Sequence, residues 1–421
     1  MSIHLIGVLG LVLVFVVGTA RPVNLGALAL VMTYLVGTFA VGEGVRDMYG
    51  AFPVDLLVLL VGVTYLFGVA ASNGTVEHIV EGAARVVQGR RALIPWIVFV
   101  VASLPAMAGA LGSAGVAMLA PLSLRLAERY RIDRRMIGLM VVHGAAAGNF
   151  SPLNVLGAIV TQAMAKNGLE MSVSALFFAN LAYNVVLAVA IFVVFGGLRL
   201  AGSPDGAVSP LAAGPDVVAP PVRRLRIDQI FTLVALASVA IAAFRFGLNI
   251  GFVALAAAAS LHLLFPLSSA GADKRIAWSV VLLVCGIVTY VGALQRYGTV
   301  DAVGGAIAGF GSPLLTGLLI CAVAAITSAF ASSAGILGAM IPLAVPFMAQ
   351  GDIGTTGLVV AIAISATVVD ATPFSTVGAL VVANADVEEQ PKIYRGLLAW
   401  GAVMVVTAPI ITWLLFILPA T

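Results

Sequence analysis

Two short polar segments interrupt long apolar stretches at matching places in the two halves of the sequence. The first is Gly144-Ala-Ala-Ala-Gly-Asn-Phe-Ser-Pro152, with Asn154 just beyond it, and the second is Asp370-Ala-Thr-Pro-Phe-Ser-Thr376. Each contains a proline, which removes a backbone donor and breaks a helix. Backbone groups freed at membrane depth must be buried in protein or line a wet cavity. The pair therefore predicts a polar site for a small ligand where the two segments meet.

Two further segments of small residues accompany these breaks. Gly112-Ser-Ala-Gly115 precedes the first and Ser332-Ser-Ala-Gly335 precedes the second. Each lies in the middle of an apolar hairpin, near residues 93–127 and 313–349. Small residues permit a tight turn and a close approach of the backbone to a ligand. We therefore expect these segments to be hairpin tips that face the breaks.

The ligand expected at such a site is an anion held without a cationic side chain, because every Lys and Arg falls at the flank of an apolar stretch. Helix N-termini attract anions through unpaired N–H groups and the helix dipole, and hydroxyl and amide donors add hydrogen bonds. For each hydroxyl taken singly, the alternative is a bond to the backbone of its own helix. The predicted substrate-binding residues are Ser113, Gly115, Ser151, Asn154, Ser333, Gly335, Thr372, Ser375 and Thr376.

A cation is expected beside the anion. Asp370 is the only acidic residue deep in an apolar span, and Asn149 stands at the equivalent place in the first half. Carboxylates within a membrane are costly and usually functional. We expect Asp370 to bind a cation, with sodium near Asn149 and Asp370, or to carry a proton; the alternative is a cap on the second half-helix. The predicted cation-binding residues are Gly112, Asn149, Ser332 and Asp370, and no other cofactor is expected.

His143 lies one turn before Asn149. A buried, hydrogen-bonded histidine is one interpretation, and a role in proton sensing is the other.

The composition defines the class of protein that must position these residues. Hydrophobic residues make up 62% of the 421 positions and charged residues 9%, against about 25% charged in soluble domains. The apolar runs predict an all-α polytopic membrane protein. The net charge of +3 is too small to suggest a nucleic-acid partner. Hydrolase and zinc-protease motifs are absent, which argues against an enzyme.

The sequence contains two copies of one internal repeat. Asn24-Leu-Gly matches Asn249-Ile-Gly at an offset of 225, and Val63-Thr-Tyr matches Val288-Thr-Tyr at the same offset. Ser151-Pro-Leu-Asn-Val-Leu-Gly-Ala158 matches Thr372-Pro-Phe-Ser-Thr-Val-Gly-Ala379 at an offset of 221. Matches in one order at nearly constant offset indicate duplicated units. We expect repeats at residues 1–200 and 227–421, joined by a Pro- and Gly-rich cytoplasmic linker at 201–226.

Each repeat is expected to contribute five crossings and one re-entrant hairpin, about ten transmembrane helices in all. An odd number of crossings makes the second repeat inverted. The predicted spans are 3–19, 24–42, 54–72, 136–165, 173–198, 228–244, 249–266, 276–294, 356–384 and 396–417.

Charge gives the expected orientation. On this layout seventeen Lys and Arg residues fall on one side of the membrane and four on the other. The side with more Lys and Arg residues is expected to be the cytoplasm by the positive-inside rule. Both termini are therefore expected in the periplasm of a bacterial inner-membrane protein. The four residues on the poor side are Arg46, Lys166, Arg245 and Arg296.

At these residues the chain resembles the ion-transporter superfamily that contains the divalent anion/sodium symporters. The region from Met1-Ser-Ile-His-Leu-Ile-Gly through Gly148-Asn-Phe-Ser-Pro-Leu-Asn154 looks like dicarboxylate carriers of the MatC (malonate carrier) type. The resemblance implies a homodimer with an elevator-like moving domain and a malonate or C4-dicarboxylate substrate. The Ser-Asn-Thr tip motif of the symporters is replaced here by Gly-Ser-Ala-Gly and Ser-Ser-Ala-Gly.

These expectations together favour a secondary transporter, because paired interruptions in two halves are typical of transporter substrate sites. Sodium or protons would drive the symport of small carboxylates. The alternative is the membrane subunit of a binding-protein-dependent carboxylate system.

Overall fold

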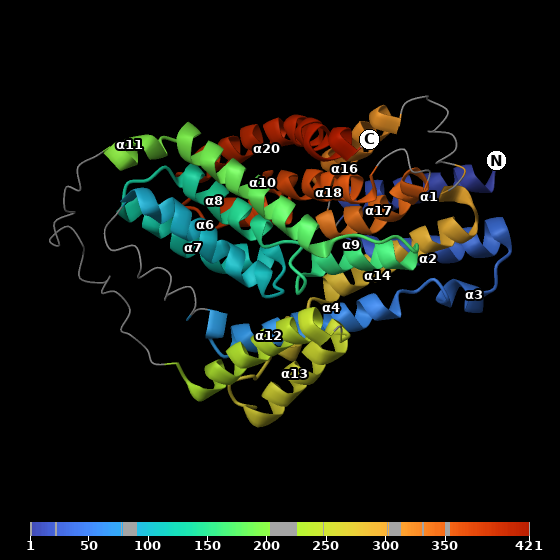
Figure 1. The fold of residues 1–421 in the computed structure, drawn as a ribbon, viewed down its shortest axis with the longest axis horizontal. Helices are drawn as coiled ribbons and strands as arrows, with labels where there is room; N and C mark the ends of the chain where they lie inside the picture. Colours follow the sequence, from blue (N-terminus) through green and yellow to red (C-terminus); the bar gives the residue numbers. More distant parts are fainter. Residues whose placement is uncertain are drawn as a thin grey trace.

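The computed structural model describes residues 2–21, 23–76, 78, 91–202, 225–246, 248–300, 302, 313–330, 332–349 and 354–420, and these residues form helices and connecting turns without a strand. Figure 1 shows an elongated bundle in which most helices run along the longest axis. The predicted all-α polytopic fold is confirmed. Most of the predicted linker, residues 203–224, lies outside the described residues.

The first half contains ten described α-helices and one π-helical continuation. In chain order they are α1 (Ile3–Ala20), α2 (Leu25–Leu35) continued by η1 (Val36–Val41), α3 (Val45–Tyr49), α4 (Val54–Ser72), α6 (Ile94–Met107), α7 (Gly112–Arg129), α8 (Arg134–Ala147), α9 (Val155–Lys166), α10 (Val173–Val194) and α11 (Gly197–Gly202).

The second half repeats this order. Its described helices are α12 (Ile227–Phe246), α13 (Ile250–Leu264), α14 (Trp278–Arg296), α16 (Pro313–Ser328), α17 (Ser333–Ala349), α18 (Thr355–Val368) continued by η5 (Val369–Ala371), α19 (Thr376–Ala383) and α20 (Gln390–Thr412) continued by η6 (Trp413–Ile417).

Five of the described helical segments are long and apolar enough to cross a membrane: Val54–Ser72, Val173–Val194, Trp278–Arg296, Thr355–Ala383 and Gln390–Ile417. Each coincides with a predicted span. The other predicted spans are shorter apolar helices, and the span at 136–165 is divided into α8 and α9. Both predicted hairpins are helix pairs, α6 with α7 and α16 with α17.

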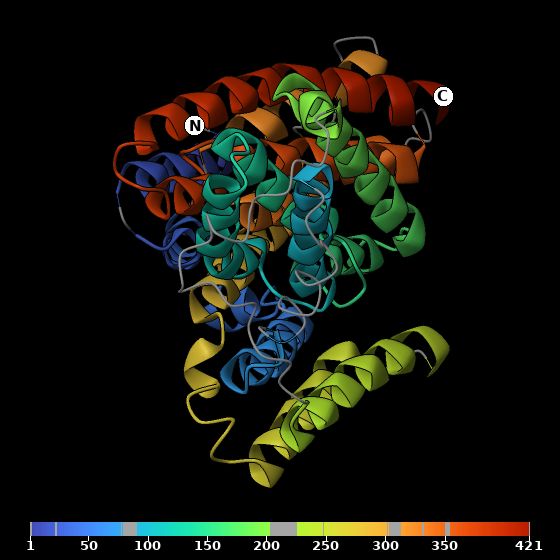
Figure 2. The ribbon, with the colours of Figure 1, turned by 90° about the vertical axis from the view of Figure 1, so that its left-hand side faces the viewer.

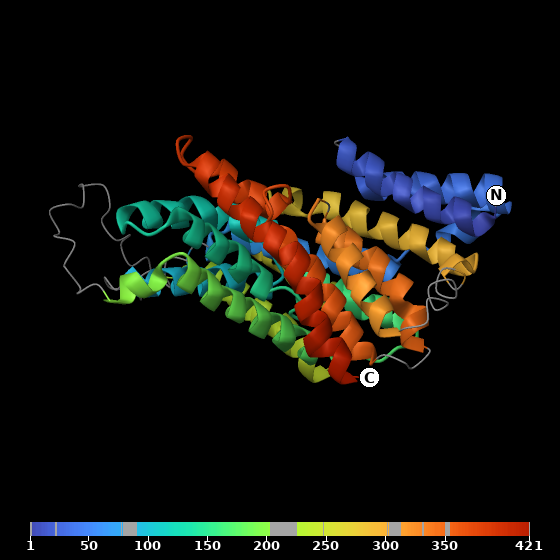
Figure 3. The same cartoon turned by 90° about the horizontal axis from the view of Figure 1, so that it is seen from above.

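The helices form two groups. A peripheral group consists of α1, α2, α4, α12, α13 and α14, and a central group consists of α6–α10 and α16–α20. Figure 2 shows α12 and α13 standing out from the rest of the molecule beside α4. Figure 3 shows α1 and α2 beside α14. The halves exchange partners in the peripheral group, because α2 of the first half packs on α14 of the second and α13 packs on α4.

The matched Asn-x-Gly segments explain this exchange. Asn24 and Asn249 are the N-caps of α2 and α13, and their side chains accept hydrogen bonds from backbone amides of the first turn. Two residues later come Gly26 and Gly251. A Cβ on Gly26 would lie 1.9 Å from the carbonyl oxygen of Leu282, and one on Gly251 would lie 2.7 Å from backbone atoms of Leu59. Only glycine permits backbones to approach this closely.

The hairpin turn precedes the predicted tip. The first hairpin turns at residues 108–111, where Gly109 has φ of 105°, a conformation that favours glycine. Gly112–Gly115 forms the first turn of α7, and Ser333–Gly335 begins α17. The small residues therefore expose the amino ends of these two helices instead of making the turn.

The two breaks follow a common plan. Phe150 is completely buried at the first break and has φ of 63°, a strained conformation for a bulky residue. Each broken segment then folds back on the helix that follows it. A Cβ on Gly157 would lie 2.7 Å from the carbonyl oxygen of Ser151, and one on Gly378 would lie 2.0 Å from that of Thr372. These glycines are the matched positions near the ends of the repeated octapeptides.

Candidate functional site

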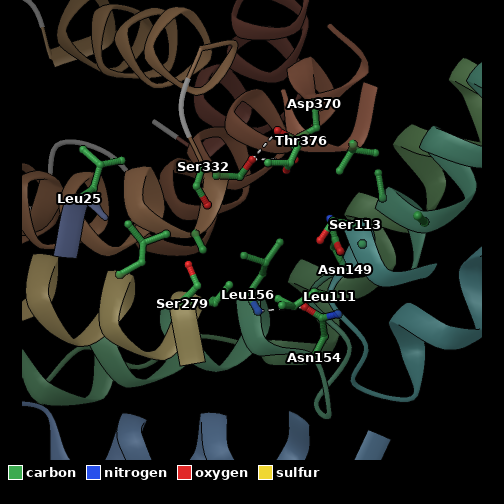
Figure 4. Close-up of a pocket in the computed structure, with 18 of the residues that line it drawn as sticks. Leu25, Leu111, Ser113, Asn149, Asn154, Leu156, Ser279, Ser332, Asp370 and Thr376 are labelled. Carbon is green, nitrogen blue, oxygen red and sulfur yellow. Dashed lines mark hydrogen bonds between the residues drawn. The ribbon is translucent and has the colours of Figure 1, made fainter. Parts of the chain in front are cut away.

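A cavity of about 290 Å³ lies where the two hairpins and the two breaks meet. Its wall includes the first turns of four helices (Figure 4). These contribute Gly112 and Ser113 of α7, Leu156 of α9, Ser333 and Ala334 of α17, and Thr376 and Val377 of α19. The cavity therefore joins both halves of the chain, as the paired breaks predict.

The ends of these helices determine the electrostatic field in the cavity. Each helix N-terminus acts as about half a positive charge. Those of α7, α9, α17 and α19 border the cavity from the central group, and those of α2 and α14 border it from the peripheral group. The carboxyl end of α8, through Val142, Ala145 and Ala146, forms another part of the wall and contributes a partial negative charge. Among the described residues that line the cavity, none is Lys, Arg or His. An anion here would be held by backbone dipoles and hydroxyl groups.

Three hydroxyl groups are available to a ligand: those of Ser113 and Thr376, which were predicted to bind the substrate, and that of Ser332, which was predicted to bind the cation. Ser113, Ser332 and Thr376 line the cavity, and Figure 4 labels all three. Their side chains make no hydrogen bond to other parts of the chain that the structure describes. Gly112 also lines the cavity, and a Cβ added to it would meet nothing within 4 Å.

Asp370 lies in η5 at the cavity wall. The Oγ of Ser333 donates to its carboxylate, 2.7 Å from Oδ1 and 2.6 Å from Oδ2, and the Oγ of Ser328 donates to that of Ser333 at 3.1 Å. The N-cap of the second half-helix is Ser375. The alternative role of Asp370 as that cap is therefore filled by another residue.

Asn149, the equivalent residue in the first half, is 5% exposed and also lines the cavity. Its Oδ1 is buried and accepts no hydrogen bond from the described residues. A buried acceptor without a donor is costly. An amide oxygen and a carboxylate on one cavity are the hard oxygen ligands that suit a small cation.

Two predicted substrate residues have a structural role instead. The Oγ of Ser151 donates to the carbonyl of Met107 at 2.8 Å, and the Oγ1 of Thr372 donates to the carbonyl of Ala329 at 2.8 Å. Neither lines the cavity. Each hydroxyl ties a broken segment to the carboxyl end of the hairpin helix in its own half, because that helix end leaves carbonyls unpaired.

Asn154 and Ser375 are likewise engaged. Asn154 borders the cavity, but its Nδ2 donates to the carbonyls of Ala106 (2.9 Å) and Ala110 (3.1 Å), and its Oδ1 accepts from the amide of Leu156. Ser375 donates to backbone carbonyls of its own segment and accepts from the amide of Gly378 at 3.0 Å. Both side chains cap helices, so neither has a free donor for a ligand.

The predicted glycines Gly115 and Gly335 do not line the cavity. A Cβ on Gly115 would lie 3.6 Å from the side chain of Pro105, and one on Gly335 would lie 3.4 Å from that of Leu283. Both glycines lie deeper in their helices than the lining residues, where they provide packing.

A buried polar network behind Asn149 was not predicted. Nδ2 of Asn180 donates to the carbonyl of Ala146 at 2.8 Å and to that of Asn149 at 3.3 Å. Nδ2 of Asn184 donates in turn to Oδ1 of Asn180 at 3.1 Å. The sequence does contain a signal for this network: Asn180 and Asn184 lie one turn apart in an apolar span. Buried polar groups need partners, so this pair predicts buried hydrogen bonds.

His143 ends this network. The Nε1 of Trp400 donates to its Nε2 at 2.9 Å, and its Nδ1 lies 3.0 Å from Oδ1 of Asn184. Indole nitrogen only donates, so Nε2 accepts, and the proton resides on Nδ1. His143 is completely buried and hydrogen-bonded on both nitrogens. This arrangement supports the packing interpretation of His143 over proton sensing.

The peripheral group supplies the remaining wall. Asn24, which caps α2, donates through Nδ2 to the carbonyl of Ser279 at 2.8 Å, and both residues line the cavity. The repeat identifies Asn24 as a matched position, but no sequence pattern indicates that it belongs to the site. The cavity thus lies between the two groups of helices.

Known proteins resemble this chain in part of its sequence and in its fold. Residues 1–149 match the family model described as "Dicarboxylate carrier protein MatC N-terminus". The resemblance to the MatC type is confirmed. Over the rest of the chain the likeness is one of fold: the crystal structure of the YdaH transporter of Alcanivorax borkumensis is similar with a TM-score of 0.57 and 12% identity, over 87% of this chain and 86% of that one. No curated protein matches the sequence. The family match thus covers about the first third of the chain, and the shared fold extends over most of it.

Proposed function

We propose that this protein is a secondary active transporter that carries a small dicarboxylate, of the malonate or C4 class, together with a sodium ion or a proton. The observation that carries the proposal is the convergence of helix N-termini from both halves of the chain on a cavity with free hydroxyl groups and without a lining Lys or Arg among the described residues. The family match at residues 1–149 supports the substrate class.

The charges fit a dianion. Each helix N-terminus contributes about half a positive charge, and several of them border the cavity, so their combined field attracts the two carboxylates of a dianion. Ser113 and Ser332 approach from one hairpin each and Thr376 from the second break. In this arrangement each substrate carboxylate is held at the amino ends of helices from different halves of the chain.

Asp370 supplies the coupling. Its negative charge lies on the same cavity, so a dianion and an ionised Asp370 repel each other. A sodium ion between Asp370 and Asn149, or a proton on Asp370, removes that repulsion. Cation occupancy then favours substrate binding, and by linkage the substrate favours cation binding to the same degree.

Movement follows from the position of the cavity between the two groups of helices. We propose that the central group carries the substrate past the peripheral group, which acts as the scaffold, in an elevator-type cycle. The working form is a homodimer in the bacterial inner membrane, with both termini in the periplasm and the linker at residues 201–226 in the cytoplasm.

Purified protein in liposomes tests the function. We expect uptake of radiolabelled malonate or succinate against its concentration gradient when a sodium or proton gradient is imposed, without any other protein. Uptake only after addition of a soluble binding protein would support the binding-protein-dependent alternative. Absence of uptake with every dicarboxylate and both gradients would contradict the proposal.

A further inference from the structure

A second cavity, of about 760 Å³, lies where the carboxyl end of α10 meets the amino end of α20. We refer to it as the α10–α20 groove. It is separate from the substrate cavity and shares no lining residue with it. Three of its lining residues are cationic: Arg135, Lys392 and Arg395.

The groove divides along its length into a charged end and an apolar end. On α20 its wall is made by Lys392, Arg395, Gly396, Ala399, Trp400 and Val403, a spacing of three and four residues that forms one helix face. The cations occupy the first part of this face and apolar side chains the remainder. Val194 and Phe195 of α10 form the opposite wall of the groove. Arg395 and Val403 are separated by roughly 12 Å along the helix axis.

The position of Arg135 is fixed. Its Nη2 pairs with Asp133 at 2.7 Å and its guanidinium lies 5.1 Å from the ring centre of Phe195. A Cβ on Gly396 would lie 2.7 Å from Arg135 Cδ, so this glycine gives the side chain its space. Burial raises the pKa of Asp133, but hydrogen bonds and charge from Arg135 outweigh burial and lower the pKa overall. The pair is therefore ionised.

The other two cations are less engaged. Lys392 lies 3.7 Å from Glu389, and both side chains are partly exposed, so the pair is weak. Arg395 is exposed and has no acidic group within 4.0 Å in the described part of the chain. Among the described residues that line the groove, Glu388 is the one acidic residue, and the nearby Asp386 pairs with Arg134. Within the described lining of the groove, cations outnumber carboxylates by three to one.

The apolar end is open at the surface of the protein. Val194 is 68% exposed and Val403 is 51% exposed, and α10 and α20 are both long enough to cross a membrane. The helix surface there faces lipid. A ligand of the groove would therefore have an anionic head beside Arg395 and Lys392 and a hydrocarbon chain along Ala399, Trp400 and Val403.

We propose that the α10–α20 groove binds one anionic phospholipid, with its phosphate between Lys392 and Arg395 and an acyl chain between α10 and α20. Basic pockets between transmembrane helices are suited to anionic headgroups. The site requires only that the protein spans a membrane, so it stands or fails separately from the transported substrate.

Native mass spectrometry of the purified protein tests the site with equal amounts of phosphatidylglycerol and phosphatidylcholine. We expect the wild type to retain phosphatidylglycerol preferentially. The double variant Lys392→Gln/Arg395→Gln should lose phosphatidylglycerol affinity by about thirtyfold, since each surface cation contributes about 1 kcal/mol. The matched control is Lys274→Gln/Arg275→Gln, which removes two exposed cations outside the groove.

A third variant, Ala399→Trp, fills the apolar end and keeps all three cations. It should also lower phosphatidylglycerol retention, whereas excess inorganic phosphate should not displace the lipid from the wild type. Equal retention of the two lipids, an unchanged Lys392→Gln/Arg395→Gln variant, an unchanged Ala399→Trp variant, or displacement by phosphate would each overturn the proposal.

Discussion

Asp370 and Asn149 occupy equivalent positions in the two repeats but have different surroundings. The carboxylate of Asp370 accepts hydrogen bonds from Ser333, whereas Oδ1 of Asn149 has no donor among the described residues. Because the first half has Asn149 where the second half has Asp370, the two equivalent positions contribute one ionisable side chain to the cavity and not two. Two carboxylates there would require two compensating cations, so the asymmetry sets the charge that a coupling ion must balance.

Ser113 tests the anion side of the site. We expect Ser113→Ala to raise the KM for dicarboxylate roughly ten- to a hundredfold, because one hydrogen bond to a charged ligand is worth about 1.5–3 kcal/mol. Thermal stability should not change, since the hydroxyl has no partner among the described residues. Uptake kinetics and thermal unfolding of the same preparation measure both quantities.

Ser151→Ala is the matched control. Its hydroxyl bonds the carbonyl of Met107, so its loss should cost about 1–3 kcal/mol of stability with a smaller change in KM. An unchanged KM in Ser113→Ala, with normal uptake, would remove Ser113 from the substrate site.

Asn180 tests the network behind Asn149. Asn180→Ala removes the donor to the carbonyls of Ala146 and Asn149, which leaves the unwound segment free to shift. We expect the cation concentration for half-maximal uptake to rise about tenfold, with a smaller change in KM for the dicarboxylate at saturating cation. Trp400→Phe, which removes only the distal bond to His143, should have a weaker effect. Equal losses in cation and substrate affinity would indicate general disruption instead.

At the scale of elements, the hairpin turn depends on one glycine. Gly109→Ala places a Cβ at positive φ and 2.5 Å from Cγ1 of Val63. We expect a loss of about 1–3 kcal/mol in stability from the strained backbone, seen as a lower unfolding temperature. Gly112→Ala is the control, because nothing lies within 4 Å of a Cβ there. Similar unfolding temperatures for the two variants would contradict the assignment of the turn.

The elements could be predicted more closely than the contacts of their side chains. Apolar length and the repeat locate α4 at residues 54–72 and both breaks, because these depend on local sequence. The roles of Ser151 and Thr372 could not be predicted, since their partners are backbone carbonyls more than 40 residues away. Asn24 and Ser279 line the cavity because α2 of the first half packs against α14 of the second half. This packing is a property of the assembled fold and cannot be read from either segment alone.

At the scale of the whole molecule, a side-chain hydrogen bond links the two groups of helices away from the cavity. Nε2 of Gln295 on α14 donates to Oδ1 of Asn167, just beyond α9, at 3.2 Å. If the central group moves past the peripheral group, this contact must break. A disulfide in Asn167→Cys/Gln295→Cys should therefore block uptake, and reduction should restore it. The native Cys285 and Cys321 are both buried and are replaced by Ala in the background.

The control is Glu43→Cys/Arg296→Cys joined by a short bifunctional thiol reagent, because the ion pair of 2.7 Å within the peripheral group is made by the ends of two long side chains and a disulfide spans less distance. This crosslink should leave most of the uptake intact. Full uptake with the Asn167–Gln295 crosslink formed would contradict relative movement of the two groups.

The central claim is that Asp370 couples a cation to a dicarboxylate in one cavity, and Asp370→Asn in proteoliposomes tests it most directly. The substitution preserves shape and copies Asn149, but removes the charge that binds sodium or a proton. We expect the variant to lose gradient-driven accumulation of radiolabelled malonate or succinate and to retain exchange of internal for external substrate. Accumulation by the variant with the ion dependence of the wild type would contradict the account.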